Sequence, residues 1–312
     1  MVELLSMKTK AIGLVSGGLD SMIATKLMID QGIEVIPVKF TSPFFHSEDI
    51  KKEPIDFLGL KLRLIQVGEE YLSIIRNPEF GYGAGLNPCV DCKIYMLKEA
   101  GKIMKETGAS FVFTGEVLNQ RPFSQKKIFF ELVNRETLLK GRILRPLSAQ
   151  LLEPTEPELA GFVDRSKLLA ISGRRRMQQV AIAEKMGIKD YPQPAGGCLL
   201  TDKIYAEKLK KLLNYWDECT LNDAEIIKHG RVFWAGDVLL VVGRNKEENE
   251  LLRTIAKKND IIVQLKSVPC PLTVLRGKNI DNSAIEYAKD LIVYYTKRAG
   301  RDKSEFSVEK IQ

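Results

Sequence analysis

The chain of 312 residues is poor in the residues that mark several common protein classes. It has two histidines, His46 and His229, which restricts the zinc sites that it can build. Its five cysteines are an odd number, and their spacing is not that of a disulfide framework. No apolar run approaches the length of a membrane span, and the first residues show no signal-peptide pattern. These absences predict a cytoplasmic protein with no membrane contact, whose cysteines are metal ligands, catalytic thiols or core residues.

The composition is otherwise that of a globular protein with room for two domains, with 45% hydrophobic and 28% charged residues. The net charge of +7 is uneven, because residues 1–214 carry 31 Lys and Arg against 25 Asp and Glu. Basic runs lie at residues 165–167, 174–176 and 203–211. A solvated helix surface is the ordinary explanation of any single run. Several runs together also suit a polyanionic partner such as RNA.

The first two thirds of the chain alternate apolar strands with helical patterns. The expected strands are residues 11–15, 34–40, 62–67 and 110–114. The expected helices are residues 21–31, 48–58, 88–107, 174–187 and 201–214. This alternation predicts an α/β fold with a doubly wound parallel sheet, in which ligands bind at the carboxyl ends of the strands.

A different pattern begins near Tyr215. Short strands are expected at residues 232–234, 238–242, 261–265 and 272–275, and helices at residues 247–257 and 283–297. The chain is therefore predicted to hold one domain at residues 1–214 and a smaller α+β domain at residues 215–312.

A glycine-rich segment joins the first expected strand to the first expected helix. It consists of Ser16, Gly17, Gly18, Leu19, Asp20 and Ser21. Glycines let the backbone approach a phosphate, and the free N–H groups of the helix point at it. The two serines add donors, and Asp20 can hold Mg²⁺ that bridges phosphate oxygens. The lysine of the Walker A pattern is absent, and an ordinary strand–helix connection stays open as the alternative.

The letters SGGLDS behind an apolar strand resemble the PP-loop signature of the ATP pyrophosphatases. That family cleaves ATP to AMP and pyrophosphate and adenylates a carbonyl oxygen of its substrate. The resemblance implies that ATP is gripped by the loop, with Gly115 at the end of another strand beside it. The implied nucleotide-binding residues are Ser16, Gly17, Gly18, Asp20, Ser21 and Gly115, and Asp20 is also implied in catalysis.

Three cysteines form a second candidate site. Cys89 and Cys92 make a CxxC at the start of an expected helix, where the helix N-terminus favours the thiolate. Cys198 follows two glycines and is a plausible third ligand, so that three thiolates can hold a 4Fe–4S cluster with one iron open. A redox pair of Cys89 with Cys92, a zinc site with a fourth ligand from elsewhere, and a structural Cys198 stay open.

Four segments resemble the PP-loop tRNA thiolation enzymes, a branch related to the 2-thiouridine and 4-thiouridine synthetases. They are NPCVDCK, TGEVLNQRPFSQ, ISGRRRMQQVAIAEKMGI and YPQPAGGCLLTD, within about residues 8–210. The resemblance implies an ATP-dependent tRNA sulfurtransferase with Cys89, Cys92 and Cys198 as catalytic residues and as ligands of a 4Fe–4S cluster. Other members use a persulfide on cysteine instead. The implied partners are tRNA and a sulfur donor: sulfide, a cysteine desulfurase or a sulfur carrier protein. A homo-oligomer stays open.

RNA contacts are expected in both domains. Arg174, Arg175 and Arg176 are candidates for RNA phosphate contacts, because guanidinium groups suit phosphate. Residues 225–312 resemble the NFACT-R domain, which implies RNA binding or a role near the ribosome. The alternative function is therefore an RNA- or ribosome-associated nucleotide-binding factor without thiolation activity. A purely structural or docking role for the second domain is also open, since its charge is nearly neutral.

Overall fold

The computed structural model describes residues 8–45, 58–189, 191, 198–266, 268–296 and 305–312. Two compact units divide the chain, unit 1 at residues 1–198 and unit 2 at residues 199–312. No helix in these described ranges is long and apolar enough to cross a membrane.

Unit 1 is built on a parallel sheet of five strands in the order β3-β2-β1-β4-β5. The strands are β1 (Lys10–Leu14), β2 (Glu34–Thr41), β3 (Arg63–Gln66), β4 (Phe111–Thr114) and β5 (Ile143–Leu144). The chain runs outward from β1 through β2 to β3, and then returns to place β4 on the other side of β1. The strand order therefore reverses between β1 and β4, which is where doubly wound sheets bind ligands.

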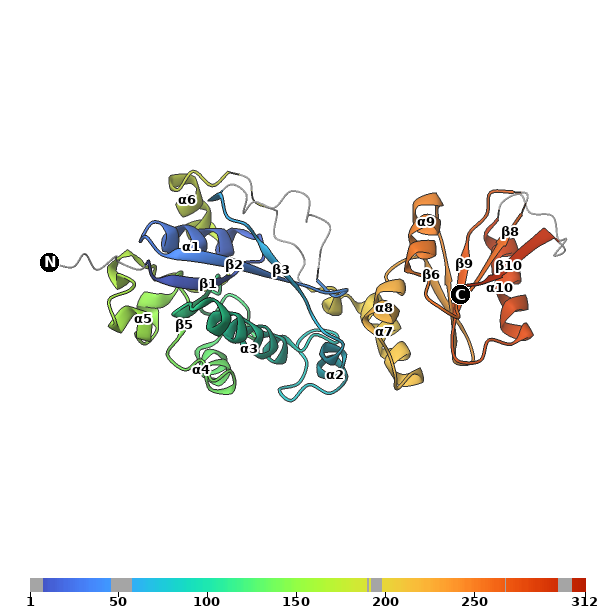
Figure 1. Cartoon of the computed structure of the whole chain (residues 1–312), viewed down its shortest axis with the longest axis horizontal. Coiled ribbons are helices and arrows are strands. Elements are labelled where there is room, and N and C mark those ends of the chain that lie inside the picture. The colour runs from blue at the N-terminus through green and yellow to red at the C-terminus, as the bar shows by residue number, and fades with distance from the viewer. Residues whose placement is uncertain (1–7, 46–57, 190, 192–197, 267, 297–304) are drawn as a thin grey trace. The chain divides into compact units, whose positions relative to one another are not determined.

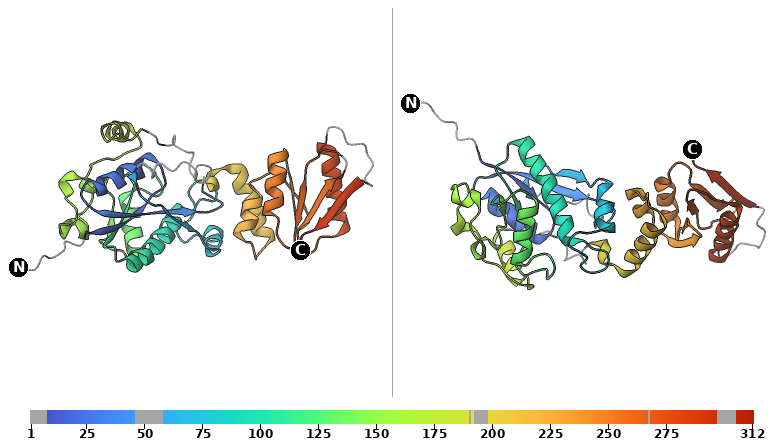
Figure 2. Two further views of the ribbon diagram at one scale, coloured as in Figure 1. Left: turned by 45° about the horizontal axis from the view of Figure 1, so that its top comes forward. Right: turned by 90° about the horizontal axis from the view of Figure 1, so that it is seen from below.

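Helices cover both faces of this sheet, with α1 and α6 on one face and α3 and α4 on the other (Figures 1 and 2). Their bounds are α1 (Leu19–Ile29), α2 (Glu70–Arg76), α3 (Cys89–Thr107), α4 (Lys127–Glu136), α5 (Glu156–Leu159) and α6 (Met177–Lys185). The core is closely packed, because Met22 and Ile23 of α1 lie buried against Phe111 and Phe113 of β4. The doubly wound α/β fold expected from the alternating pattern is confirmed.

Unit 2 contains an antiparallel sheet in the order β10-β8-β9-β7-β6. The strands are β6 (Arg231–Ala235), β7 (Val238–Val242), β8 (Ile261–Leu265), β9 (Thr273–Arg276) and β10 (Phe306–Lys310). The helices are α7 (Lys203–Tyr215), α8 (Leu221–Ile226), α9 (Lys246–Ile255) and α10 (Asn282–Tyr295). Alternate residues of β7, Val238, Leu240 and Val242, share one core cluster with α10, while α8 and α9 lie over the other face (Figure 1). This is the smaller α+β domain expected from the sequence.

The division between the units lies earlier than the boundary expected after residue 214, because α7 belongs with unit 2. The Tyr205 hydroxyl of α7 donates to the Ala224 carbonyl (2.9 Å), and the Lys208 Nζ donates to the Ile227 carbonyl (3.3 Å). These contacts bind α7 to α8. The sequence pattern showed α7 as a helix but carried no sign of its partner.

Several elements differ from the sequence expectations. The helix expected at residues 48–58 lies almost wholly outside the described residues. Among the α-helices and strands of the described residues, six were not expected at all: α2, α4, α5, β5, α8 and β10. β5 has two residues, and β10 is an edge strand with exposed residues, so neither shows a clear apolar period.

Candidate functional site

The glycine loop lies at the reversal of the strand order, between the end of β1 and the start of α1. Gly17 has a φ of 81°, and Gly18 is the extended N-cap residue of α1. The Ser21 hydroxyl donates to the Gly18 carbonyl (2.7 Å), and the Gly18 N–H donates to the Ser16 hydroxyl (3.3 Å). The two hydroxyl oxygens lie 3.4 Å apart. The loop therefore gathers both serine hydroxyls at a helix N-terminus, which is the arrangement of an anion site.

Gly115 brings the end of β4 against the first turn of α1. A Cβ atom built on Gly115 would lie 2.6 Å from the Ser21 nitrogen and 2.7 Å from its Cα. Both are backbone atoms that cannot move aside, so a larger residue is excluded here. The expected pairing of Gly115 with the loop is thus matched by close contact in the structure.

A chain of two amides holds the Asp20 carboxylate. The Gln120 Nε2 donates to the Asp20 Oδ2 (2.8 Å), and the Gln179 Nε2 of α6 donates to the Gln120 Oε1 (3.0 Å). Gln179 is 0% exposed. The Asp20 Oδ1 is also buried and has no hydrogen-bond partner among the described residues. Since a buried carboxylate oxygen without a partner is costly, this atom is suited to a cation.

The three arginines expected to contact RNA divide into two groups. Arg174 and Arg175 are exposed. Arg176, at the N-cap position of α6, has its Nη2 atom 3.7 Å from the Asp20 Oδ2. The half-buried Arg176 guanidinium therefore lies beside Asp20 of the glycine loop, where its charge suits the phosphates of a nucleotide as well as those of RNA.

The first turn of α3 carries Cys89 and Cys92. The turn is fastened by Asp91, whose carboxylate accepts hydrogen bonds from the backbone N–H groups of Glu79 (2.8 Å) and Phe80 (3.3 Å). Cys92 is buried, and Cys89 is half-buried. The N-terminal turn of the helix is thus held against the preceding loop, with one thiol inside and one at the edge.

Cys198 lies near this turn although it is distant in sequence. Its Sγ atom donates to the Phe44 carbonyl (3.2 Å), and the ring of Phe44 packs on that of Tyr71 at 5.8 Å. Burial raises the pKa of Tyr71 well above its usual value, and it is followed by the charge of Cys92, a hydrogen bond with Cys92 and the charges of Cys198 and Cys89. The structure therefore brings the three cysteines around one aromatic side chain. Gly196 and Gly197, which were expected to allow this approach, lie outside the described residues.

The expected lowering of the thiol pKa values is wrong. Burial raises the pKa of Cys89, and it raises the pKa of Cys92 to about 12. The charges of Lys93 and Arg121 act in the other direction at Cys89 but do not overcome burial. The effect of the helix N-terminus on the thiol pKa is local and can be predicted from the sequence. The desolvation that raises the pKa comes from residues distant in sequence.

Three thiols are suitable ligands for an iron–sulfur cluster. The positions of these three cysteines in the structure do not form such a site. Within the residues that the structure describes, no group of three or more His, Cys, Asp or Glu side chains is arranged to hold a metal ion. Cys219 and Cys270 lie in unit 2. The Cys270 Sγ accepts a hydrogen bond from the Leu265 N–H (3.1 Å), in keeping with a structural role.

A cluster of buried charges, not expected from the sequence, connects α3 with the strand ends. Glu116 follows β4 and pairs with Lys93 of α3 and with the Arg145 Nε after β5 (3.1 Å). Burial, followed by the charges of Arg121 and Arg145, lowers the pKa of Lys93 to about 7. The Arg145 guanidinium also lies 4.0 Å from the centre of the Phe130 ring. Lys93 and Glu116 follow directly on Cys92 and Gly115, and that adjacency was the only signal in the sequence.

Consecutive residues connect the loop with the cysteines. Gln120 donates to the Asp20 carboxylate, and the charge of the next residue, Arg121, acts on the Cys89 thiol. One short segment after β4 therefore contacts the Asp20 carboxylate and contributes charge at the Cys89 thiol. The segment TGEVLNQRPFSQ marked this region in the sequence, but the roles of its Gln and Arg were not expected.

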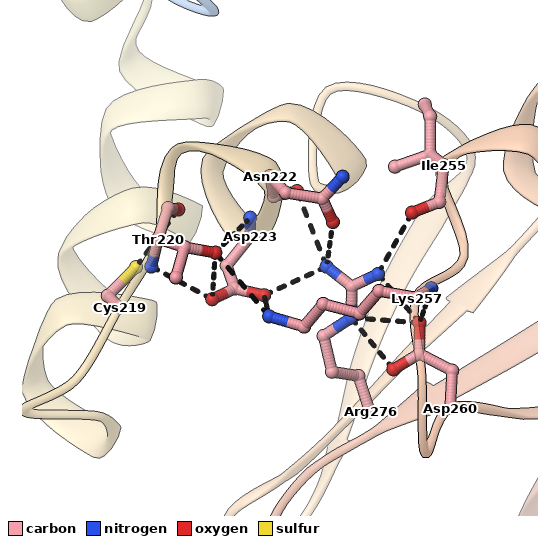
Figure 3. Close-up of polar contacts among 8 residues, drawn as sticks. All are labelled: Cys219, Thr220, Asn222, Asp223, Ile255, Lys257, Asp260 and Arg276. Atoms are coloured by element: carbon pink, nitrogen blue, oxygen red, sulfur yellow. Dashed lines mark hydrogen bonds and ion pairs between the residues drawn. The ribbon is translucent and has the colours of Figure 1, made fainter. Parts of the chain in front are cut away.

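Unit 2 has a buried charge cluster of another kind (Figure 3). Arg276 of β9 is 3% exposed and lies between two carboxylates, with its Nη1 2.8 Å from the Asp223 Oδ1 and its Nη2 2.6 Å from the Asp260 Oδ2. Lys257 also pairs with Asp223 (2.7 Å), and the Asn222 side chain accepts from Arg276 (2.8 Å). The cluster fastens α8 to the sheet and leaves the Arg276 guanidinium fully paired.

Two family models match separate parts of the chain. The model described as thiamine biosynthesis protein (ThiI) matches residues 6–150, and the model described as NFACT protein RNA binding domain matches residues 230–312. The first match contains the glycine loop, Cys89, Cys92 and the segment after β4. The second contains the strands and the last two helices of unit 2.

Curated relatives share the first region. A probable tRNA sulfurtransferase of Methanosarcina mazei is 35% identical over 122 residues, which are 36% of this chain and 29% of the relative. A probable tRNA sulfurtransferase of Thermococcus kodakarensis is 36% identical over 119 residues, 36% of this chain and 30% of the relative. The chain thus spans less than a third of the length of these relatives.

Solved structures show more distant likeness. A crystal structure of a 4-thiouridine synthetase–RNA complex with bound ATP has 23% identity and a TM-score of 0.42, covering 65% of this chain and 50% of that chain. The U34-tRNA thiolase NcsA from Methanococcus maripaludis with its 4Fe–4S cluster has 16% identity and a TM-score of 0.33, covering 66% of each chain.

Proposed function

We propose that this chain is an ATP-dependent tRNA sulfurtransferase, because residues 6–150 match the ThiI family model and residues 230–312 match the model of the NFACT protein RNA binding domain. In this proposal a base carbonyl of tRNA is adenylated, and its oxygen is then replaced by sulfur. The observation that carries the proposal is the pair Gln120 and Arg121, which face the Asp20 carboxylate and the Cys89 thiol respectively. An activating site and a thiol site thus share one edge of the sheet.

The glycine loop binds ATP through its pyrophosphate part. The N–H groups at the start of α1 and the hydroxyls of Ser16 and Ser21 donate to phosphate oxygens, and Gly115 keeps the approach open. Arg176 adds positive charge beside the loop. Asp20 would hold Mg²⁺ through its unpartnered Oδ1, and that ion would neutralise phosphate charge.

Adenylation prepares the base for sulfur. The carbonyl oxygen attacks the α-phosphorus of ATP, the bond to the bridging oxygen breaks, and pyrophosphate leaves. The oxygen is thereby converted from a poor leaving group into part of AMP. Sulfide, as HS⁻, then attacks the same carbon and forms the C–S bond. The C–O bond breaks, AMP departs with the original oxygen, the S–H proton is released, and a thiocarbonyl is left on the base.

Cys89, Cys92 and Cys198 would form the site that receives the sulfide. Burial raises the pKa of Cys89 and of Cys92, whereas the charges of Lys93 and Arg121 act at Cys89 to favour its thiolate. The same three thiols are the donor set of a 4Fe–4S cluster, the finer part of this proposal. About four iron and four acid-labile sulfide per chain after anaerobic purification, lost in Cys89→Ala, supports the cluster. Iron-free protein that retains thiolation activity overturns it.

RNA reaches the site from the exposed surface that carries Arg174 and Arg175, with further contacts in unit 2. The sulfur donor is an external partner: sulfide, a cysteine desulfurase or a sulfur carrier protein. Support for tRNA as the substrate comes from the two curated relatives, which are probable tRNA sulfurtransferases.

The test is a single reaction of the full chain with ATP, unmodified tRNA and sulfide. The proposal expects tRNA-dependent release of pyrophosphate, and a thionucleoside in digests of the tRNA analysed by mass spectrometry. Asp20→Ala should lose both products, whereas Asp30→Ala, at the other end of α1, should keep both. Binding of tRNA without pyrophosphate release from the intact protein would contradict the proposal and leave a nucleotide-binding RNA factor.

A further inference from the structure

An aromatic cluster lies where the C-terminal end of α7 meets the edge strand β6. The rings of Tyr215 and Trp234 are 4.8 Å apart and inclined by 35°, and Trp216 meets Trp234 edge-on at 5.9 Å. The Trp216 Nε1 donates to the Asp237 carbonyl (2.9 Å), which fixes that ring. Tyr215 is the outer member and is 46% exposed. Packing explains Trp216, but it does not explain a half-exposed tyrosine stacked beside a tryptophan.

Lysines continue this surface along α7. The Lys211 Nζ lies 5.6 Å from the centres of both the Tyr215 and Trp234 rings. Lys203 and Lys210 are exposed on the adjoining face of the helix, at a separation of two turns, with Glu207 as the acidic residue between them. The face thus carries an excess of positive charge beside flat aromatic surface.

We infer that Lys203, Lys210, Lys211, Tyr215 and Trp234 form a contact surface for unpaired RNA, the α7 stacking surface. Bases stack on the aromatic rings, and the lysines bind the phosphates on either side. Aromatic rings with interleaved cations are the usual platform for single-stranded nucleic acid, because every base has a flat face. Duplex RNA buries those faces and is excluded from such a platform.

This surface explains how a nearly neutral domain can contact RNA. Unit 2, residues 199–312, carries 20 Lys and Arg against 17 Asp and Glu, so it lacks the overall charge of an electrostatic clamp. Stacking does not depend on net charge, and the lysines of α7 supply charge locally. The surface includes α7, which lies outside the matched residues 230–312, so the family match does not assign it. The inference rests on the proposed function only in taking RNA as the partner.

The test measures binding of a fluorescently labelled 12-nucleotide oligouridylate to the full chain by anisotropy. Tyr215→Ala should weaken binding about 5- to 150-fold, which corresponds to the free energy of about 1–3 kcal/mol for loss of one base stack. Tyr215→Phe keeps the ring and should bind as the wild type does. Lys210→Gln and Lys211→Gln should each reduce the slope of log affinity against log salt by about 0.7.

Matched variants and the intrinsic fluorescence of the chain locate the contact. Tyr294→Ala removes another exposed tyrosine, on α10, and Lys310→Gln removes an exposed lysine on β10, the opposite edge strand; both should bind as the wild type does. The two tryptophans of the chain are Trp216 and Trp234, so bound oligouridylate should quench the tryptophan emission.

Three results would overturn the inference: unchanged binding by Tyr215→Ala, equal losses in the control variants, or equal affinity for a duplex of the same length. Failure of this inference can be distinguished from failure of the proposed function. If wild-type protein binds and thiolates tRNA while Tyr215→Ala matches it, only the stacking surface fails. If the wild type binds neither oligouridylate nor tRNA, the RNA partner itself is wrong.

Discussion

Each unit holds a carboxylate that contacts buried polar groups, and the two differ in how completely that carboxylate is paired. In unit 2, Asp223 accepts hydrogen bonds from Arg276, Lys257 and Thr220, so both of its oxygens are used. In unit 1, Asp20 has one oxygen bound to Gln120 and one buried oxygen without a partner in the described residues.

A buried charge alone therefore does not mark a functional site. A paired cluster such as that of Arg276 fastens elements to one another (Figure 3). A cluster with a free buried acceptor, at the ends of parallel strands, is set to receive a ligand. The predictions that follow test this difference in each unit.

The largest effect on activity is expected at Asp20, the carboxylate with an oxygen that is unpaired among the described residues. Asp20→Ala should reduce pyrophosphate release about 10²- to 10³-fold, the usual scale for loss of one charge-stabilising group at a reacting centre. Its melting temperature should stay near that of the wild type, because Asp20 is not fully paired. A large loss of stability with normal turnover would break the comparison, since Asp20 would then be structural.

The next effect is expected at the paired cluster. Arg276→Met leaves the Asp223 and Asp260 carboxylates buried without their guanidinium partner, which should destabilise unit 2 by about 3–5 kcal/mol. Urea unfolding followed by tryptophan emission reports on unit 2, because both tryptophans lie there. Arg253→Met, an exposed arginine on α9, is the control and should cost less than about 1 kcal/mol. Equal losses in the two variants would contradict the account.

A smaller effect is expected in the amide chain that holds Asp20. Gln179→Leu removes the donor to Gln120 and should slow pyrophosphate release about tenfold, the cost of one buried hydrogen bond. Gln178→Leu changes the exposed neighbour and should leave the rate unchanged. Added Mg²⁺ should partly restore Gln179→Leu if the amides position the carboxylate. If neither Gln179→Leu nor added Mg²⁺ changes the rate of pyrophosphate release, the two amides do not position the Asp20 carboxylate for the reaction.

The smallest effect is the response of unit 2 to acid. Burial acts to raise the pKa of Asp223, but hydrogen bonds from Lys257 and Thr220 and the charge of Arg276 outweigh it and lower that pKa below 3.8. The stability that this carboxylate contributes is therefore present above pH 3.8 and lost as the pH falls through its folded pKa. Asp223→Asn should show a shallower loss of tryptophan-monitored stability below pH 4, relative to its own value at pH 7. An unchanged slope would remove Asp223 from the acid response.

Local signals allowed the glycine loop to be predicted from the sequence. Gly17 and Gly18 directly follow an apolar strand, and the turn they form involves only neighbours in the chain. The cysteine group was predicted in outline, because the spacing of Cys89 and Cys92 is local, but their pKa values were not. Burial reverses the effect of the helix N-terminus at both thiols.

Contacts between side chains that are distant in sequence could not be predicted from the sequence pattern. The partners of Arg276 come from α8 and from the end of α9, and nothing within β9 indicates them. Gln120 and Gln179 are ordinary polar residues until the fold brings them into line with Asp20. The α4 helix was missed even though its sequence is amphipathic.

In the proposed mechanism, activation of the base depends on the glycine loop and sulfur transfer depends on the three cysteines, so the two steps are separable. The most direct measurement follows pyrophosphate release and thionucleoside formation together in Cys198→Ala, with Cys219→Ala as the matched cysteine control in unit 2. The account predicts that Cys198→Ala still releases pyrophosphate in a tRNA-dependent manner but forms no thionucleoside, while Cys219→Ala does both. Full thiolation by Cys198→Ala would contradict it.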